Sequence, residues 1–260
     1  MQPFSKLALT ALLAHLLGDF PLQSSEMLRG KSEGLRAYFA HGGLHFLLLV
    51  AGIGIFAGLQ WFTSISFWIV VLLYIALHLV IDRTKQKLVS RESWNDSTLI
   101  LVGDQLLHIS TLVVMAWLLT RPSWSVLRSE FRWSAATGEK VLEAGAVYVA
   151  VMFAGGHLIR YLTRNLGTGI EMAGGNVEEA KNAGMYIGWL ERFLVVTAIV
   201  VQSPSLVGLI LTGKSIARFP ELKDDRFAQY FLIGTLLSIG LAVLGGLILA
   251  KLWYGTVSLK

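Results

Sequence analysis

The sequence predicts an all-α, polytopic transmembrane helical bundle of about seven helices, and three observations support this fold class. Of the 260 residues, 54% are hydrophobic and only 15% are charged, whereas a soluble domain carries about 25% charged residues. The mean hydropathy is +0.61. Most apolar residues fall into runs close in length to the roughly 20 residues that a helix needs to cross the bilayer core.

The predicted spans follow one another as apolar runs separated by polar or glycine-rich segments. The first span is short and stops at Pro21, because proline lacks the N–H group that continues a helix. An alternative is six spans preceded by a re-entrant first segment. In chain order the runs are 4–20, 41–62, 65–82, 99–120, 142–161, 186–211 and 230–253.

No soluble domain or low-complexity tract separates the spans in the sequence, so we expect one membrane domain. Residues 22–38 are polar and are expected to form a short amphipathic or surface piece. Gly145, Gly155 and Gly156 in the fifth run allow close approach of a neighbouring helix. We divide the chain into residues 1–120, whose four helices form two tandem hairpins, and residues 121–260, which supply three further helices.

Four pairs of ionisable residues, each with a spacing of four, lie within or at the ends of the first four spans. A spacing of four places both side chains on one face of a helix. Shifting the first two pairs by 63 positions superposes them on the last two. Because successive spans run in opposite directions, all four pairs are expected near the same membrane face. The pairs are His15/Asp19, His41/His45, His78/Asp82 and Asp104/His108.

These eight residues predict a monometallic or bimetallic site. Charged groups in a span cost about 2.5 to 3.5 kcal/mol each, and a divalent cation offsets that cost by coordinating imidazole and carboxylate groups. The chain has no cysteine, so the ligands suit a divalent transition metal, with Zn or Mn favoured. The alternative is a set of interhelical Asp–His hydrogen bonds that joins the helices.

Other polar residues have less specific interpretations. Gln105 either orients a ligand or forms a helix–helix hydrogen bond. Glu191 and Arg192 are expected to form an internal ion pair, with Glu191 as a catalytic base in a sharper alternative. His157 is expected to pack at the interface. A small excess of Lys and Arg on the side of the pairs places the site towards the cytoplasm, and this assignment of the basic residues leaves no need for a nucleic-acid partner.

Several stretches resemble an uncharacterised bacterial membrane family, known as domain of unknown function 3307. The stretches in the first four spans are 15–23, 77–82 and 104–108, and those in the second half are 188–192 and 214–223. The resemblance implies a bacterial inner-membrane protein, and it implies no activity.

Two functions follow from the predicted site. The first is a metal-dependent hydrolase that acts on a lipid-borne ester or phosphoester at the membrane surface, with Asp104 or Glu191 as the base. The second is a transporter of metal ions or protons, which would need polar residues at several depths. A scaffold with a structural metal is a third possibility. The expected partners are membrane lipids and the divalent metal.

Overall fold

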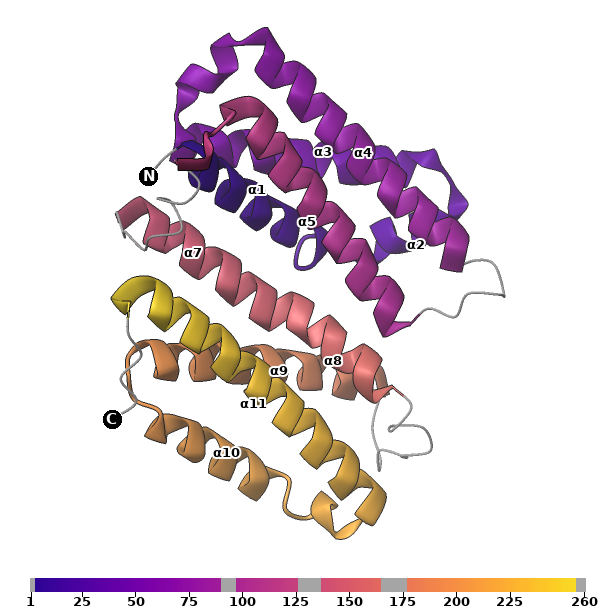
Figure 1. Cartoon of the computed structure of the whole chain (residues 1–260). Helices are drawn as coiled ribbons and strands as arrows, with labels where there is room; N and C mark the ends of the chain where they lie inside the picture. Colours follow the sequence, from indigo (N-terminus) through magenta and orange to yellow (C-terminus); the bar gives the residue numbers. More distant parts are fainter. Residues whose placement is uncertain (1–2, 90–96, 126–136, 165–176, 256–260) are drawn as a thin grey trace. The chain divides into compact units, whose positions relative to one another are not determined.

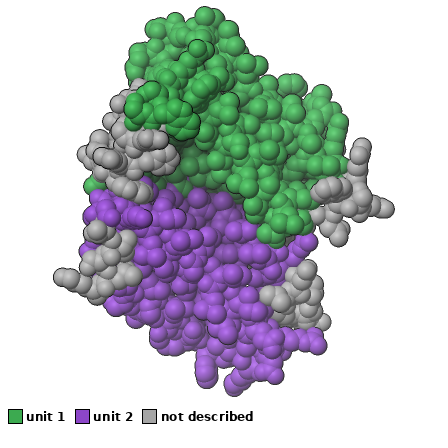
Figure 2. Space-filling view, in the orientation of Figure 1, with its two compact units in different colours: residues 1–146 green, residues 147–260 purple. Residues whose placement is uncertain are grey.

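The computed structural model describes residues 3–89, 97–125, 137–164 and 177–255, and every regular element in these residues is a helix. The chain forms two compact units, residues 1–146 and 147–260 (Figure 2). Each unit is described by itself. The all-helical prediction is confirmed, and six helices within these described ranges are long and apolar enough to span a membrane.

Unit 1 contains the predicted tandem hairpins. Its helices are α1 (Pro3–Asp19), α2 (Ser25–Glu33), α3 (Leu35–Gly52), α4 (Ile65–Val89) and α5 (Thr98–Thr120) (Figure 1). Helix α1 has 17 residues and is therefore about 25 Å long, so it falls just below the length of the six candidate spans. The short α2 occupies the polar segment predicted to lie at the surface, where the Ser24 side chain caps its N-terminus.

Helices α1, α3, α4 and α5 form a closed four-helix bundle. Helix α1 packs against α3, α3 against α4, α4 against α5, and α5 returns to α1. A short π-helix, η1 (Ile53–Ala57), and a 3₁₀ turn, η2 (Leu59–Thr63), connect α3 to α4. Such a ring gives each helix one inward face, and side chains on the four inward faces meet in the centre of the bundle.

Apolar side chains fill one part of this centre and also cover its outside. Leu7, Leu49, Phe67 and Leu112 are at most 2% exposed and belong to one hydrophobic cluster. Large apolar residues such as Leu47, Leu72 and Leu107 are more than half exposed. An apolar exterior around a helical bundle is what a lipid environment requires.

Unit 2 differs from the prediction at the sixth span. Helix α7 (Thr137–Val149) crosses from unit 1 into unit 2, where η3 (Ala150–Ala154, a π-helix) and α8 (Gly155–Thr163) continue it. The predicted span 186–211 is wrong, because α9 (Val177–Val200) ends before a turn and α10 (Ser205–Ala217) starts after it. Gln202 has a φ of 58° in this turn, and Pro204 follows it.

The turn reverses the chain, so α10 packs antiparallel against α9 and the final helix returns parallel to α9. The final helix, α11 (Asp225–Tyr254), is preceded by η4 (Glu221–Lys223) and packs along α9. Glycines allow close helix contacts in unit 2, as predicted for Gly155, which joins α8 to α11. A Cβ atom there would collide with Leu241, and one on Gly246 would lie 2.7 Å from Ile199.

Candidate metal centre

All eight paired residues lie in the centre of the four-helix bundle. Helix α1 supplies His15 and Asp19, α3 supplies His41 and His45, α4 supplies His78 and Asp82, and α5 supplies Asp104 and His108. The spacing of four turns both members of each pair inward. The five imidazoles are at most 2% exposed, and the three carboxylates are 4 to 9% exposed. The predicted convergence of the eight side chains is therefore present in the structure.

Three imidazoles surround one carboxylate oxygen, Asp19 Oδ1. The distances from this oxygen to Nε2 of His45, His41 and His78 are 3.0, 3.3 and 3.7 Å. The other oxygen, Oδ2, lies 3.6 Å from His15 Nε2. A carboxylate oxygen has two lone pairs, so one hydrogen bond to each imidazole cannot account for all three contacts at Oδ1.

The second hairpin builds the other half of the cluster. Asp82 Oδ1 lies 3.4 Å from His108 Nε2, which also lies 3.5 Å from Asp104 Oδ1. His41 connects the two halves, because its Nε2 lies 3.3 Å from both Asp19 Oδ1 and Asp82 Oδ2. His41 Nε2 is also 3.2 Å from His78 Nε2. The cluster is therefore continuous from α1 to α5.

Three overlapping groups in this cluster could hold a metal ion. Within each group the potential ligand atoms lie within 4.8 Å of one another. Neighbouring ligands of a tetrahedral zinc ion, with bonds of about 2.0 to 2.1 Å, stand about 3.3 to 3.4 Å apart, close to the contacts in the cluster. The groups are His15, Asp19, His45 and His78; His41, His78 and Asp82; and Asp82, Asp104 and His108.

Several polar atoms of the cluster are buried without a hydrogen-bond partner in the described part of the chain. They are both ring nitrogens of His108, Nδ1 of His15 and His78, and Oδ1 of Asp104. An unpaired buried polar group costs about 1 to 3 kcal/mol. A self-sufficient network of Asp–His hydrogen bonds would not leave so many atoms unpaired. The pattern fits a metal-binding site better than helices joined by hydrogen bonds alone.

Three polar residues that the sequence analysis did not single out as site residues contact the cluster. Lys31 Nζ of α2 contacts Asp82 Oδ2, and Lys85 Nζ of α4 lies 2.8 Å from Asp104 Oδ2. The amide of Gln23 lies 3.4 Å from His41 Nδ1. In the amide orientation that pairs both groups, the Gln23 side-chain oxygen accepts from Lys31 Nζ and the side-chain nitrogen donates to the Asp19 carbonyl. Partners of this kind hold a metal-binding imidazole in one orientation.

Gln105 and Gly18 complete the surroundings of Asp19. The Gln105 amide group lies 3.3 Å from Asp19 Oδ2, and its oxygen lies 3.3 Å from His15 Nε2. Both of its predicted roles, orienting a cluster residue and bonding two helices, are thus combined in one side chain. A Cβ atom on Gly18 would lie 2.5 Å from His45 Nε2, so only glycine leaves room for this imidazole.

The remaining candidate residues lie in unit 2. Glu191 Oε2 accepts from Lys214 Nζ at 2.6 Å, and the predicted Glu191–Arg192 ion pair is not the contact that forms. Arg192 instead donates to the Met152 carbonyl at 2.7 Å and to Ser238 Oγ at 3.2 Å. Glu191 and Arg192 have different partners because adjacent residues on a helix point in different directions. The catalytic role of Glu191 stays a prediction. His157 lies with its Nδ1 3.1 Å from the Phe153 carbonyl.

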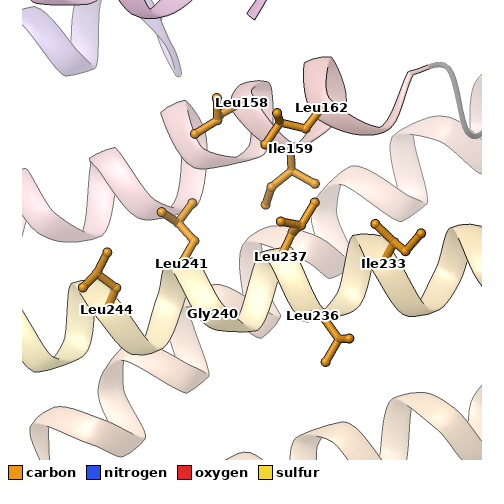
Figure 3. A pocket seen from close by; sticks show the side chains of 9 residues that line it. All are labelled: Leu158, Ile159, Leu162, Ile233, Leu236, Leu237, Gly240, Leu241 and Leu244. Carbon is orange, nitrogen blue, oxygen red and sulfur yellow. The ribbon is translucent and has the colours of Figure 1, made fainter.

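Unit 2 also contains an apolar cavity of about 510 Å³ between α8 and α11. Side chains of α11 such as Leu237 and Leu241 point towards α8 (Figure 3). The lining offers no group that could bind a metal or move a proton. The lining residues are Leu158, Ile159, Leu162, Ile233, Leu236, Leu237, Gly240, Leu241 and Leu244.

The fold and the cluster define a multi-pass helical membrane protein in which buried His and Asp residues of a four-helix bundle could hold a metal ion. Residues 7–134 match the model of the uncharacterised family described as "Protein of unknown function (DUF3307)". The match confirms the resemblance seen in the first four spans. The stretches 188–192 and 214–223 lie outside it. Neither the curated proteins nor the solved structures gave a match.

Proposed function

We propose that unit 1 is the metal centre of a membrane hydrolase that acts on a lipid-borne ester or phosphoester. The observation that carries this proposal is the meeting of eight buried His and Asp side chains at distances suited to coordination. Unpaired imidazole nitrogens in that cluster support it, since a metal ion would satisfy them.

Two of the three groups share no residue and suit two ions of different character. His15, Asp19, His45 and His78 offer three nitrogens and one oxygen, which match a four-coordinate zinc ion. Asp82, Asp104 and His108 offer two carboxylates and one nitrogen, which suit a harder ion such as Mn. The second group has three protein ligands, and an open position for water is what distinguishes a catalytic site from a structural one.

The residues around the second group can carry out hydrolysis. A bound divalent ion would polarise the substrate oxygen and make a water molecule acidic near neutral pH. We propose Asp104 as the base that accepts a proton from this water. The water oxygen then forms a bond to the acyl carbon or to phosphorus, and the bond to the leaving alkoxide breaks. The proton held by Asp104 passes to that alkoxide, which leaves as an alcohol.

A lipid-borne substrate fits the place of the cluster in the bundle. The cluster reaches the end of α1 at Asp19, whereas His78 and His108 lie near the middle of α4 and α5, so a lipid headgroup would approach it from the end of the bundle at which α1 stops. More basic residues lie at this end of unit 1 than at the other. Of the described ones, Arg29, Lys31, Arg36, Arg83, Lys85 and Lys87 contrast with Lys6, Arg121 and Lys140. This excess supports a cytoplasmic site, and the family resemblance suggests a bacterial inner membrane.

Transport is the second candidate, and the core of unit 1 argues against it. A pathway for ions needs polar residues at successive depths. Beyond the cluster, the described centre of the bundle is filled by apolar side chains such as Leu49, Phe67 and Met115. A structural metal in a scaffold would also fit the ligands. A measured turnover of substrate would distinguish the hydrolase from such a scaffold.

The first test is elemental analysis of the full chain purified in detergent without chelator. We expect one or two equivalents of transition metal, and a loss of metal in His45→Ala and Asp104→Ala. The matched control is His157→Ala, which removes a histidine of unit 2 and should leave the metal content unchanged. A wild-type protein that contains no metal and takes up none would overturn the proposal.

Function is tested next with the loaded protein. Hydrolysis of short-chain ester and phosphoester lipids in mixed micelles is expected to stop with Asp104→Asn, because this change removes both the proposed base and a ligand of the second ion. Metal-dependent flux in proteoliposomes, without any hydrolysis, would instead favour transport.

A further inference from the structure

We infer that Lys31 and Lys85 form a phosphate-recognising rim on the metal centre, so that its substrate carries a phosphoryl group. The inference rests on the proposed metal centre and deepens it, because it selects a phosphoester over a carboxyl ester. It starts from the two lysine contacts, which no pattern in the sequence indicated.

The two lysines approach the cluster from different helices and each contacts a carboxylate. Lys31 Nζ meets Asp82 Oδ2, and Lys85 Nζ lies 2.8 Å from Asp104 Oδ2. In Asp104 the other oxygen, Oδ1, faces His108 at 3.5 Å. One side of the Asp104 carboxylate is thus directed to the imidazoles and the other to an ammonium group.

The exposure of these side chains places the lysines between the imidazoles and the surroundings. The Lys85 side chain is 31% exposed and that of Lys31 is 9% exposed, whereas the five imidazoles are at most 2% exposed. A headgroup that approaches the second metal group therefore meets the Lys85 ammonium group first, and then Lys31, which is as exposed as its partner Asp82. Lysine binds phosphate as a point charge, and its flexible side chain can turn from a carboxylate to a substrate.

The charge of the loaded cluster calls for an anion. Three carboxylates and two ammonium groups nearly balance while the imidazoles are neutral. Two divalent ions would add four positive charges, and bound cations are the largest local charges in such a site. An uncompensated buried charge is costly. A phosphoryl group carries the negative charge that offsets this excess, and a carboxyl ester carries none.

Metal content is measured first, and phosphate binding is then measured by calorimetry with inorganic phosphate as the probe. We expect the loaded wild type to bind phosphate and the metal-free protein to bind it far more weakly. Lys31→Met and Lys85→Met should each retain metal and weaken phosphate binding about tenfold or more, the loss expected for a charge-assisted hydrogen bond. Lys31→Arg keeps the charge and should restore most of the affinity.

The control is Lys223→Met, an exposed lysine of η4, which should bind phosphate like the wild type. A second arm compares vesicles with and without phosphatidic acid. Tighter binding to these vesicles than to free phosphate identifies a lipid headgroup as the source, and equal binding identifies a soluble phosphoester. A loaded protein that binds no phosphate, or lysine variants that bind it normally, would overturn this inference alone. A protein without metal would overturn the proposed function.

Discussion

Asp19 Oδ1 lies 3.0 Å from His45 Nε2, across the first helical hairpin of the bundle. A shift of 63 positions converts this pair into Asp82 and His108, whose Oδ1 and Nε2 atoms lie 3.4 Å apart. The sequence repeat is therefore also a repeat of contacts. It departs from symmetry where His41 corresponds to Asp104, which makes one half of the cluster richer in nitrogen and the other richer in oxygen.

This asymmetry predicts that the two ions can be removed separately. His15 belongs only to the four-residue group, and Asp104 belongs only to the group that it forms with Asp82 and His108. His15→Ala should lower the zinc content by about one equivalent and spare the second ion, and Asp104→Asn should do the opposite. Metal stoichiometry by mass spectrometry checks both. Equal loss of both ions in each variant would indicate a single site.

Gly18 provides a test that leaves every ligand in place. In Gly18→Ala the new Cβ atom would lie 2.5 Å from His45 Nε2, so the imidazole must leave its position beside Asp19. We expect reduced metal content in a helical protein. The matched control is Gly43→Ala, where a Cβ atom meets nothing within 4 Å. That variant should bind metal normally and gain up to about 1 kcal/mol of stability from helix propensity. Normal metal binding in Gly18→Ala would contradict the packing described for His45.

The convergence of the eight residues could be predicted because it depends on two simple rules. Residues four apart share a helix face, and consecutive spans alternate in direction, so the pairs on α1 and α4 meet the pairs on α3 and α5 at one level of the bundle. The lysine contacts could not be predicted in this way. The approach of Lys31 to Asp82 depends on how α2 folds over the bundle, which the periodicity of the spans does not determine.

The break between α9 and α10 does not follow from hydropathy, which remains high across residues 186–211 and indicates one helix. The signal was local, because Ser203 and Pro204 follow Gln202, and proline cannot continue the hydrogen bonds of α9. The Lys214 contact with Glu191 follows from that reversal, because α10 runs back along α9.

Metal binding should weaken as the pH falls. Imidazole binds metal only in its neutral form, and free imidazole takes up a proton near pH 6.5. Protons therefore compete with the metal at five residues. We expect stable loading at pH 8 and release between about pH 6 and pH 5, with a parallel fall in the thermal unfolding temperature of the loaded protein. Dialysis at graded pH, followed by metal analysis and reloading at pH 8, checks this order. Loading that does not change down to pH 5 would be inconsistent with imidazole ligands.

Arg192 should stabilise unit 2 without affecting the metal centre. Its guanidinium joins α9 to the Met152 carbonyl in η3 and to Ser238 in α11. Arg192→Met leaves both partners without a donor, and we expect a loss of about 2 to 4 kcal/mol of unfolding free energy. The control is Arg218→Met, which breaks an exposed contact with Glu221 and should cost less than about 1 kcal/mol. Unfolding in detergent measures both, and metal content should remain normal. Equal stability of the two variants would show that the Arg192 contacts contribute little.

The reversal at α10 makes a prediction about membrane topology that the cysteine-free chain allows to be tested cleanly. If α9 crosses the membrane and α10 turns back, the end of α8 and the start of α11 face the same side. Single cysteines replacing Arg160 and Lys223 should then react with an impermeant maleimide from one side of sealed vesicles. A cysteine replacing Tyr254, at the far end of α11, should react from the other side. A continuous span over 186–211 predicts instead that the Arg160 and Lys223 positions are labelled from opposite sides. Opposite labelling of those two positions would therefore reject the α9–α10 turn and restore the seven-span topology.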